Sequence, residues 1–293
     1  MWLKNVTTPH MRIARHDAGL AGSLRALASQ VHPVFMLPPL AASGFGAALA
    51  GLDAPGLALL HVATAFTALY TAHVKDGYVD FYHRGEDDDH PLTAAGCRLA
   101  LAASTLLFAV GTVAIGLLVG PVAALLTLPG WLVGYLHAPH LDTNPVTTTL
   151  GYPTGIGFAL VGGYYVQAGS LSTTAVGFAA VFVTVLAGIK IIDDAKDYDY
   201  DRSIDKRTVA VALGHSRART VAFGVMTLGL LAVVGLAAVG TFPPSTVAAP
   251  AVFGLVAAVS FRADDELATM LLVRGSYLFL ATLVVAVWFR PLS

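Results

Sequence analysis

The sequence predicts an all-α, polytopic membrane protein, a nine-transmembrane-helix bundle with a cytoplasmic polar cap. The chain of 293 residues is 56% hydrophobic and only 12% charged, about half the charged share of ordinary soluble domains. Its mean hydropathy is +0.71, and its apolar residues form blocks close to the ~20 residues that cross a bilayer as a helix. A soluble all-α core is the alternative, but the scarcity of charge disfavours it. The net charge of −1 gives no electrostatic basis for a nucleic-acid partner.

The segments follow from turn-forming breaks between apolar runs. Four short connections, "LDAPG", "GP", "AGSLS" and "TFPPST", are rich in the Pro, Gly and Ser residues that interrupt helices. Longer charged connections separate the remaining runs. The expected spans, in order, are 32–51, 56–75, 93–118, 121–137, 149–167, 172–192, 217–239, 246–261 and 269–289.

The basic residues predict the orientation. Of 17 Lys and Arg residues, 15 lie in the amino-terminal tail, the charged connections and the adjoining helix ends, and the short connections have none. Basic residues stay on the cytoplasmic side of a membrane. We therefore expect an integral cell membrane protein whose amino terminus and charged cap are cytoplasmic. Residues 1–28 would form a polar tail, and 29–293 a single domain in the lipid bilayer.

Two acidic segments follow the second and sixth spans on the same predicted face. Asp76 and Asp80 are four residues apart, as are Asp193, Asp197 and Asp201, so each row shares one side of a helix. Like charges at this spacing repel, and Mg²⁺ is commonly held by one or two carboxylates together with substrate phosphates. A single row fits a solvated acidic loop. Two rows on one face favour a magnesium site, in which all five aspartates are candidate metal ligands. The candidate catalytic residues are Asp76, Asp80, Asp197 and Asp201.

Basic and aromatic residues surround the acidic rows. Lys206, Arg207 and Arg202 are candidate phosphate-binding residues, because Arg in particular grips phosphate oxygens. Tyr78 and Tyr198 are candidates to stabilise a developing carbocation, although interfacial aromatic belts give the same pattern. Together these features suggest a lipid diphosphate substrate. A cation transporter is the rival class, but transporters place ionisable groups near the bilayer midplane.

The stretch "DDAKDYDYDRSIDKRTVAVALG" resembles the second Asp-rich motif of the UbiA superfamily of intramembrane prenyltransferases, D-x-x-x-D followed by G-K-R-T-L and L-G. Asp197 and Asp201 match its acids. In "DGYVDF", Asp76 stands where the first motif has Asn, Gly77 replaces the next Asp, and Asp80 matches the last one. The resemblance implies nine helices, Mg²⁺ and a polyprenyl diphosphate substrate. Glu86 or Asp87 would replace the missing acid as a metal ligand.

Two further segments point to an acceptor. "HPVFMLPP" and "GYYVQAG" resemble segments of 1,4-dihydroxy-2-naphthoate prenyltransferases, which implies menaquinone synthesis and a small aromatic acceptor. An ether-lipid glycerol phosphate or a carotenoid remains an alternative acceptor. His140 or Asp142, in the connection after the fourth span, would contact it.

Overall fold

The computed structural model describes residues 12–204 and 206–289, and the elements of regular structure in this part are helices, with one isolated β-bridge between Ala14 and Leu92. Residues 1–11 of the predicted tail lie outside this part. The remainder of the tail includes a helix, α1, which is joined to the bundle by a hydrogen bond from the Tyr70 hydroxyl to the Leu27 carbonyl (2.9 Å). The helices are α1 (Gly19–Ala28), α2 (Pro33–Leu49), α3 (Pro55–Val79), η1 (Asp80–Arg84), α4 (Ala94–Leu118), α5 (Pro121–Leu136), η2 (His137–Leu141), α6 (Pro145–Ala168), α7 (Thr173–Lys196), α8 (Tyr198–Ser203), α9 (Val209–Leu213), α10 (His215–Ala238), η3 (Pro244–Val247), α11 (Ala248–Ser260) and α12 (Asp265–Phe289).

A helix covers each of the nine expected spans. In the described residues, six helical stretches are long and apolar enough to cross a membrane, and two shorter ones, Pro33–Leu49 and Pro244–Ser260, are apolar. The ninth, α6, has 24 residues and several buried Thr and Gly residues. The apolar helices are consistent with an integral membrane protein, and the count of nine crossings stays a prediction.

Local sequence signals explain where the helices begin. α2, α3, α5 and α6 each begin at a proline, which lacks the amide hydrogen that would be unpaired at this position. The Thr93 side chain accepts a hydrogen bond from the Gly96 amide at the start of α4. Ser172 accepts one from Thr174 at the start of α7. These caps stabilise the first turns of α4 and α7, and both helices begin at the breaks that the sequence predicts.

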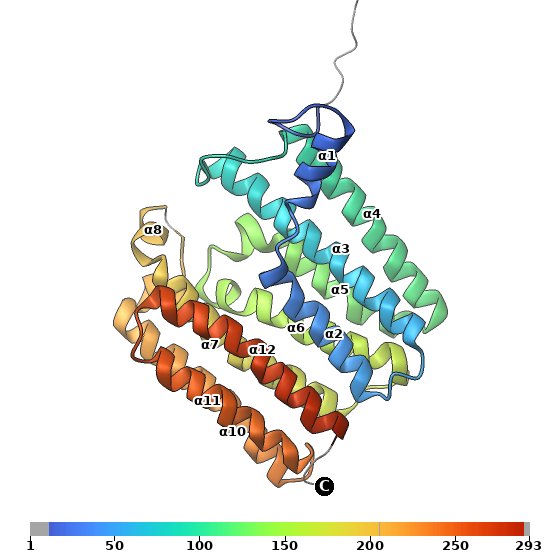
Figure 1. Cartoon of the computed structure of the whole chain (residues 1–293), viewed down its shortest axis with the longest axis vertical. Coiled ribbons are helices and arrows are strands. Elements are labelled where there is room, and N and C mark those ends of the chain that lie inside the picture. Colours follow the sequence, from blue (N-terminus) through green and yellow to red (C-terminus); the bar gives the residue numbers. More distant parts are fainter. Residues whose placement is uncertain (1–11, 205, 290–293) are drawn as a thin grey trace, which may run out of the picture.

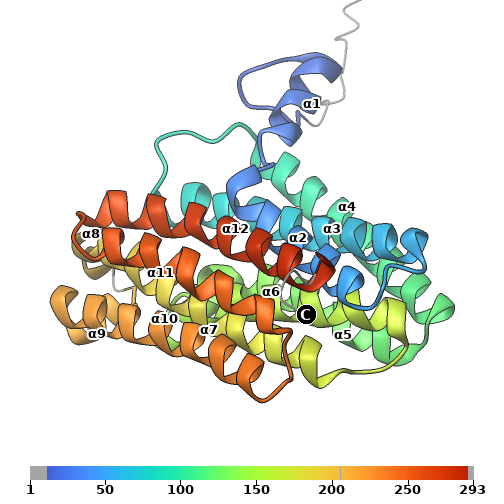
Figure 2. The same cartoon turned by 60° about the horizontal axis from the view of Figure 1, so that its bottom comes forward.

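The charged connections gather at one end of the bundle. Figure 1 shows α8 and the connections α3–α4 and α5–α6 at the upper left, and the short connections α2–α3, α4–α5 and α6–α7 at the lower right. Figure 2 shows α8, α9 and the start of α12 at the same end. The two acidic segments therefore lie on one face, as the sequence predicts.

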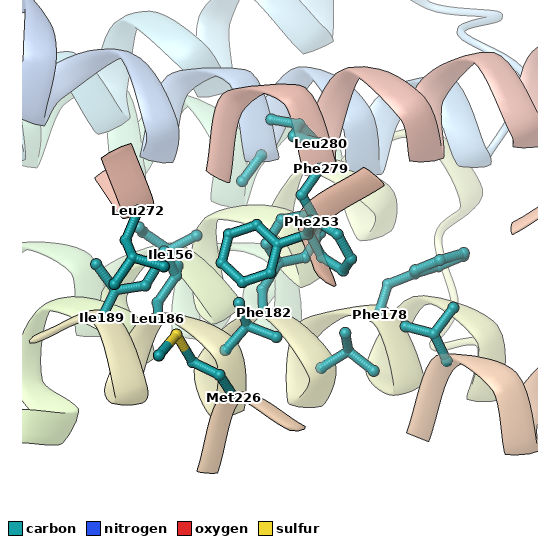
Figure 3. Close-up of a cluster of buried hydrophobic side chains, with 14 of the residues drawn as sticks. Ile156, Phe178, Phe182, Leu186, Ile189, Met226, Phe253, Leu272, Phe279 and Leu280 are labelled. Atoms are coloured by element: carbon teal, nitrogen blue, oxygen red, sulfur yellow. The ribbon is translucent and has the colours of Figure 1, made fainter. Parts of the chain in front are cut away.

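The core is built around α7. Phe178, Phe182 and Leu186 of α7 are buried against side chains from α6, α10, α11 and α12 (Figure 3). Phe182 meets Phe279 edge to face, with ring centroids 5.7 Å apart. Because α7 is packed on several sides, the acidic residues at its carboxyl end have a rigid support.

The outer helices expose apolar side chains. On α4, Leu106 is 64% exposed, Val113 60% and Leu117 83%. Such a continuous apolar face is unusual for a water-exposed monomer and is suited to lipid. The lipid bilayer is thus the natural partner of this surface.

Candidate functional site

The first acidic segment is carried by a change of helix type. α3 passes into the π-helical turn η1 at Asp80, and the turn ends at Gly85, whose φ of 66° is left-handed. The Glu86 amide donates a hydrogen bond to the Asp80 carbonyl (2.9 Å). A π-turn widens the helix and is often found at functional sites. Here it places Asp80 and Glu86 close to the same point at the bundle end.

The second acidic segment does not continue as one helix. α7 ends at Lys196, Asp197 is its cap, and α8 follows. The predicted face of three aspartates is therefore interrupted at its middle member. Asp193 stays on α7, Asp197 has a half-exposed side chain 3.6 Å from Lys196, and Asp201 is 1% exposed.

Asp201 is enclosed next to Lys206. Their charged atoms are 3.4 Å apart, yet neither carboxylate oxygen of Asp201 has a hydrogen-bond partner among the described residues. Burial raises the pKa of Asp201, and the neighbouring Lys206 only partly offsets that shift. Burying a carboxylate without hydrogen bonds costs folding free energy. A bound cation would reduce that cost, because it would neutralise the carboxylate.

A cavity of about 690 Å³ connects the two segments. Asp76, Asp80 and Asp193 line it, together with Lys190. Its remaining wall comes largely from α2, α3, α5 and α6, and includes Phe35, Ala68, Leu69, Phe108, Leu126, Val133, Ile156, Phe158 and Ala159. The cavity thus combines an acidic region with a long apolar region, which suits a ligand with a charged head and a hydrocarbon tail.

α8 also faces the first segment. Burial, followed by the Glu86 and Asp80 carboxylates, raises the pKa of Tyr200 on α8. The side chain of Tyr200 is itself exposed, and it is near enough to the two carboxylates for their charge to influence its ionisation. The two acidic segments therefore approach each other across the end of the bundle.

Arg84 joins the first segment to the connection that follows α5. Its guanidinium lies 2.6 Å from Asp142, 3.4 Å from Asp80 and 3.6 Å from Glu86. Asp142 is 4% exposed. Because Arg84 reaches all three carboxylates, it fixes Asp80 relative to the start of α6.

Replacing Arg84 by Gln should destabilise the protein by about 3 kcal/mol, because it leaves a buried carboxylate unpaired. The unfolding temperature in detergent measures this, and Arg84→Gln combined with Asp142→Asn should regain part of the loss. Arg25 is the control, because its pair with Asp17 is exposed. Arg25→Gln should cost less than about 0.5 kcal/mol. Equal losses for both Arg variants would contradict the bridging role of Arg84.

Several predicted site residues do not line the cavity in the part of the chain that the structure describes. Arg202 and Arg207 are exposed, and His140 is exposed in η2. Tyr78 packs against Tyr82 with centroids 5.4 Å apart, and Tyr198 packs against the hydrophobic core around α7. The residues outside the cavity lining are Tyr78, Glu86, His140, Asp197, Tyr198, Asp201, Arg202, Lys206 and Arg207. Their proposed roles stay predictions.

The donor set fits magnesium with substrate phosphates. Within residues 12–204 and 206–289 there is no group of three or more His, Cys, Asp or Glu side chains close enough to hold a metal alone. Mg²⁺ rarely uses an all-protein cage, and is usually held by one or two carboxylates, water and phosphate. Asp76, Asp80 and Asp193 offer carboxylates to one space, and Glu86 has a buried oxygen without a hydrogen-bond partner. These residues therefore suit Mg²⁺ that arrives with a diphosphate.

The structure also identifies residues that sequence reasoning missed. Lys190 lies in the cavity wall, and Asp194, 3% exposed, pairs with it at 2.6 Å. Lys190 precedes Asp193 by three residues and Asp194 by four, and residues at these spacings share a helix face, so the sequence already carried the signal for both. Arg84 lies four residues after Asp80, so the same rule would have found it.

Comparison with known proteins identifies the family of this chain. The UbiA prenyltransferase family matches residues 35–283. A 1,4-dihydroxy-2-naphthoate octaprenyltransferase from Mycobacterium tuberculosis (strain ATCC 25618 / H37Rv) is 33% identical over 219 residues, 69% of this chain and 70% of the relative.

Solved structures show the same fold. A structure reported for digeranylgeranylglyceryl phosphate synthase has a TM-score of 0.70 at 13% identity, covering 92% of this chain and 100% of that one. A UbiA homolog from Archaeoglobus fulgidus bound to GPP and Mg²⁺ has a TM-score of 0.57 at 17% identity, covering 92% and 99%. With the family match over residues 35–283, the chain belongs to the UbiA prenyltransferase family and is a prenyltransferase.

Proposed function

We propose that this prenyltransferase moves an isoprenyl chain from a polyprenyl diphosphate to a small aromatic quinone precursor, such as 1,4-dihydroxy-2-naphthoate, with the help of Mg²⁺. The observation that carries the proposal is the cavity of about 690 Å³ in which Asp76 and Asp80 at the end of α3, Asp87 and Asp89 of the following connection, and Asp193 of α7 adjoin a long apolar wall. A diphosphate head needs the acidic end and its metal ions, and an isoprenyl tail needs the apolar part.

Asp76, Asp80 and Asp193 would hold Mg²⁺, and Glu86, Asp197 and Asp201 would complete the metal site from the edge of the cavity. When bound, Mg²⁺ neutralises the diphosphate as it leaves. The apolar wall binds the tail by burying hydrocarbon, at roughly 25 cal/mol per Å². The same wall keeps water away from the allylic carbon. Water that reached this carbon would hydrolyse the substrate.

The acceptor is supported by the naphthoate prenyltransferase relative. At the cavity wall, His32 and His73 lie with ring centroids 4.8 Å apart, and Phe35 lies beside His73 at 6.5 Å. An aromatic acceptor can stack on such rings. Its nucleophilic carbon would then face the end of the isoprenyl chain, and a nearby carboxylate or imidazole would take the released proton.

The membrane arrangement belongs to the same proposal. The chain would cross the bilayer nine times, with the amino terminus and the acidic end in the cytoplasm. The basic residues support this, because most lie in or beside the charged connections at that end. The charged diphosphate head with its Mg²⁺ and the acceptor would then meet at the cytoplasmic side, while the isoprenyl tail stays among the helices.

A product assay in detergent micelles tests this function. Purified protein receives geranylgeranyl diphosphate, Mg²⁺ and a mixture of 1,4-dihydroxy-2-naphthoate, a glycerol-phosphate ether lipid and a carotenoid. We expect pyrophosphate release that EDTA abolishes, and a prenylated naphthoate by mass spectrometry. If only the ether lipid or the carotenoid were prenylated, the assignment of an aromatic acceptor would be wrong. Undiminished turnover in EDTA would overturn the role of Mg²⁺.

A further inference from the structure

The cavity has a positive charge that the proposed mechanism does not yet use. Lys190 lines it, and among the described residues of the cavity wall it is the one Lys or Arg side chain. It lies on α7, one turn before Asp193. Its stem is held in the packed part of the bundle, while its ammonium group faces the same space as the acidic residues.

Two aspartates fix this ammonium group. The Nζ atom of Lys190 donates to Asp194 at 2.6 Å and to Asp193 at 3.4 Å. Asp193 lines the cavity and Asp194 does not. Asp194 is 3% exposed, and its second carboxylate oxygen has no hydrogen-bond partner among the described residues. Asp194 therefore holds Lys190 from behind the wall, and Asp193 lies beside it at the surface of the cavity.

Three other cations near the acidic segments pair with carboxylates of their own. Lys206 lies 3.4 Å from Asp201, Lys196 pairs with Asp193 and Asp197, and Arg84 pairs with Asp142. None of the three lines the cavity. A ligand in the cavity thus meets the ammonium of Lys190 before it meets these groups.

We propose that Lys190 binds the diphosphate group of the prenyl substrate and that Asp194 is the positioning residue that aims its ammonium group. This rests on the proposed function and identifies a binding residue for its substrate. A lysine is a compact point charge with three donors, which suits phosphate oxygens. The ammonium group of Lys190 uses two of its three donors on Asp194 and Asp193, and the third would be available to a phosphate oxygen of the substrate.

The test measures binding of inorganic pyrophosphate in the presence of Mg²⁺ by calorimetry, which does not depend on turnover. Lys190→Gln should weaken binding at least about 10-fold, the effect of losing one hydrogen bond to a charged group. Lys190→Arg keeps the charge and should recover most of the affinity. Lys196→Gln is the matched control, because Lys196 also pairs with Asp193 but lies outside the cavity, and it should change the affinity less than about 3-fold.

Asp194→Asn tests the positioning role separately. It should weaken pyrophosphate binding and raise the KM for geranylgeranyl diphosphate, while the KM for the acceptor stays unchanged. A purely structural role would instead change both KM values together or lower only the unfolding temperature. Wild-type affinity in Lys190→Gln, or equal losses in Lys190→Gln and Lys196→Gln, would overturn the inference. Absence of prenyl transfer by a wild type that binds pyrophosphate through Lys190 would overturn the proposed function alone.

Discussion

Asp80→Asn is expected to reduce prenyl transfer at least about 100-fold, since it removes a charge aimed at the reacting group. Asn keeps the size of the side chain but is a poor ligand for Mg²⁺. Asp80 lies in the cavity wall with Asp76 and Asp193 and 3.4 Å from Arg84, and its carboxylate would be one of the Mg²⁺ ligands. Pyrophosphate release from geranylgeranyl diphosphate under saturating Mg²⁺ measures the loss.

Asp80→Asn should lower the activity without lowering the stability of the protein. Asp76 and Glu86 each repel the charged form of Asp80, so removing that charge relieves repulsion between carboxylates. The unfolding temperature without metal should therefore stay equal or rise, while activity falls. Added Mg²⁺ should stabilise the wild type more than the variant, because a ligand stabilises the state that binds it.

Asp88→Asn is the matched control for Asp80→Asn. Asp88 belongs to the same acidic connection, but it is exposed and does not line the cavity. Its loss should change turnover by less than about 2-fold, as for most exposed surface substitutions. If Asp88→Asn and Asp80→Asn reduced turnover equally, the acidic connection would act as a general surface charge and the site proposed here would be wrong.

The sequence predicted the helices well because their signals are local. Prolines begin α2, α3, α5 and α6, and apolar blocks define the length of each helix. The acidic rows also predicted one shared end of the bundle, since two helices that run in the same direction end on the same side. These features depend on residues that are neighbours in the chain.

The geometry of the site could not be predicted from residues that are neighbours in the sequence. The π-turn after Val79 and the break of α7 at Asp197 change which carboxylates face the cavity. An uninterrupted helix would have kept Asp193, Asp197 and Asp201 on one face, whereas the structure turns Asp201 inward. The ion pair between Arg84 and Asp142 joins residues 58 positions apart in the chain. Packing between distant segments decides such pairs, and one sequence carries no direct record of it.

The second large effect concerns the contact of α2 with α6. A Cβ added at Gly46 would lie 2.0 Å from the Leu160 carbonyl oxygen, and one at Gly163 would lie 2.1 Å from the Ser43 carbonyl oxygen. Both obstacles are backbone atoms, which have no rotamer to change. Small residues allow this close approach of helices in a membrane. The two helices are in contact at their backbones, and each contributes to the cavity wall.

Gly46→Ala should therefore destabilise the protein by about 3 kcal/mol, the upper range for overpacking, and lower its unfolding temperature in detergent by roughly 5 °C or more. Forcing α2 away from α6 also moves Phe35, whose carbonyl accepts a hydrogen bond from the Tyr152 hydroxyl at 2.7 Å. Because Phe35 and Tyr152 both line the cavity, prenyl transfer should fall along with stability.

Gly44→Ala provides a control two residues away on the same helix. A Cβ at Gly44 meets nothing within 4 Å, and Ala is favoured over Gly in a helix by about 1 kcal/mol. This variant should unfold at the wild-type temperature or slightly above it, with unchanged activity. Equal unfolding temperatures for Gly46→Ala and Gly44→Ala would mean that α2 is free to move away from α6. The wall that α2 gives to the cavity would then be adaptable, and tail binding would depend on the α3, α5 and α6 walls alone.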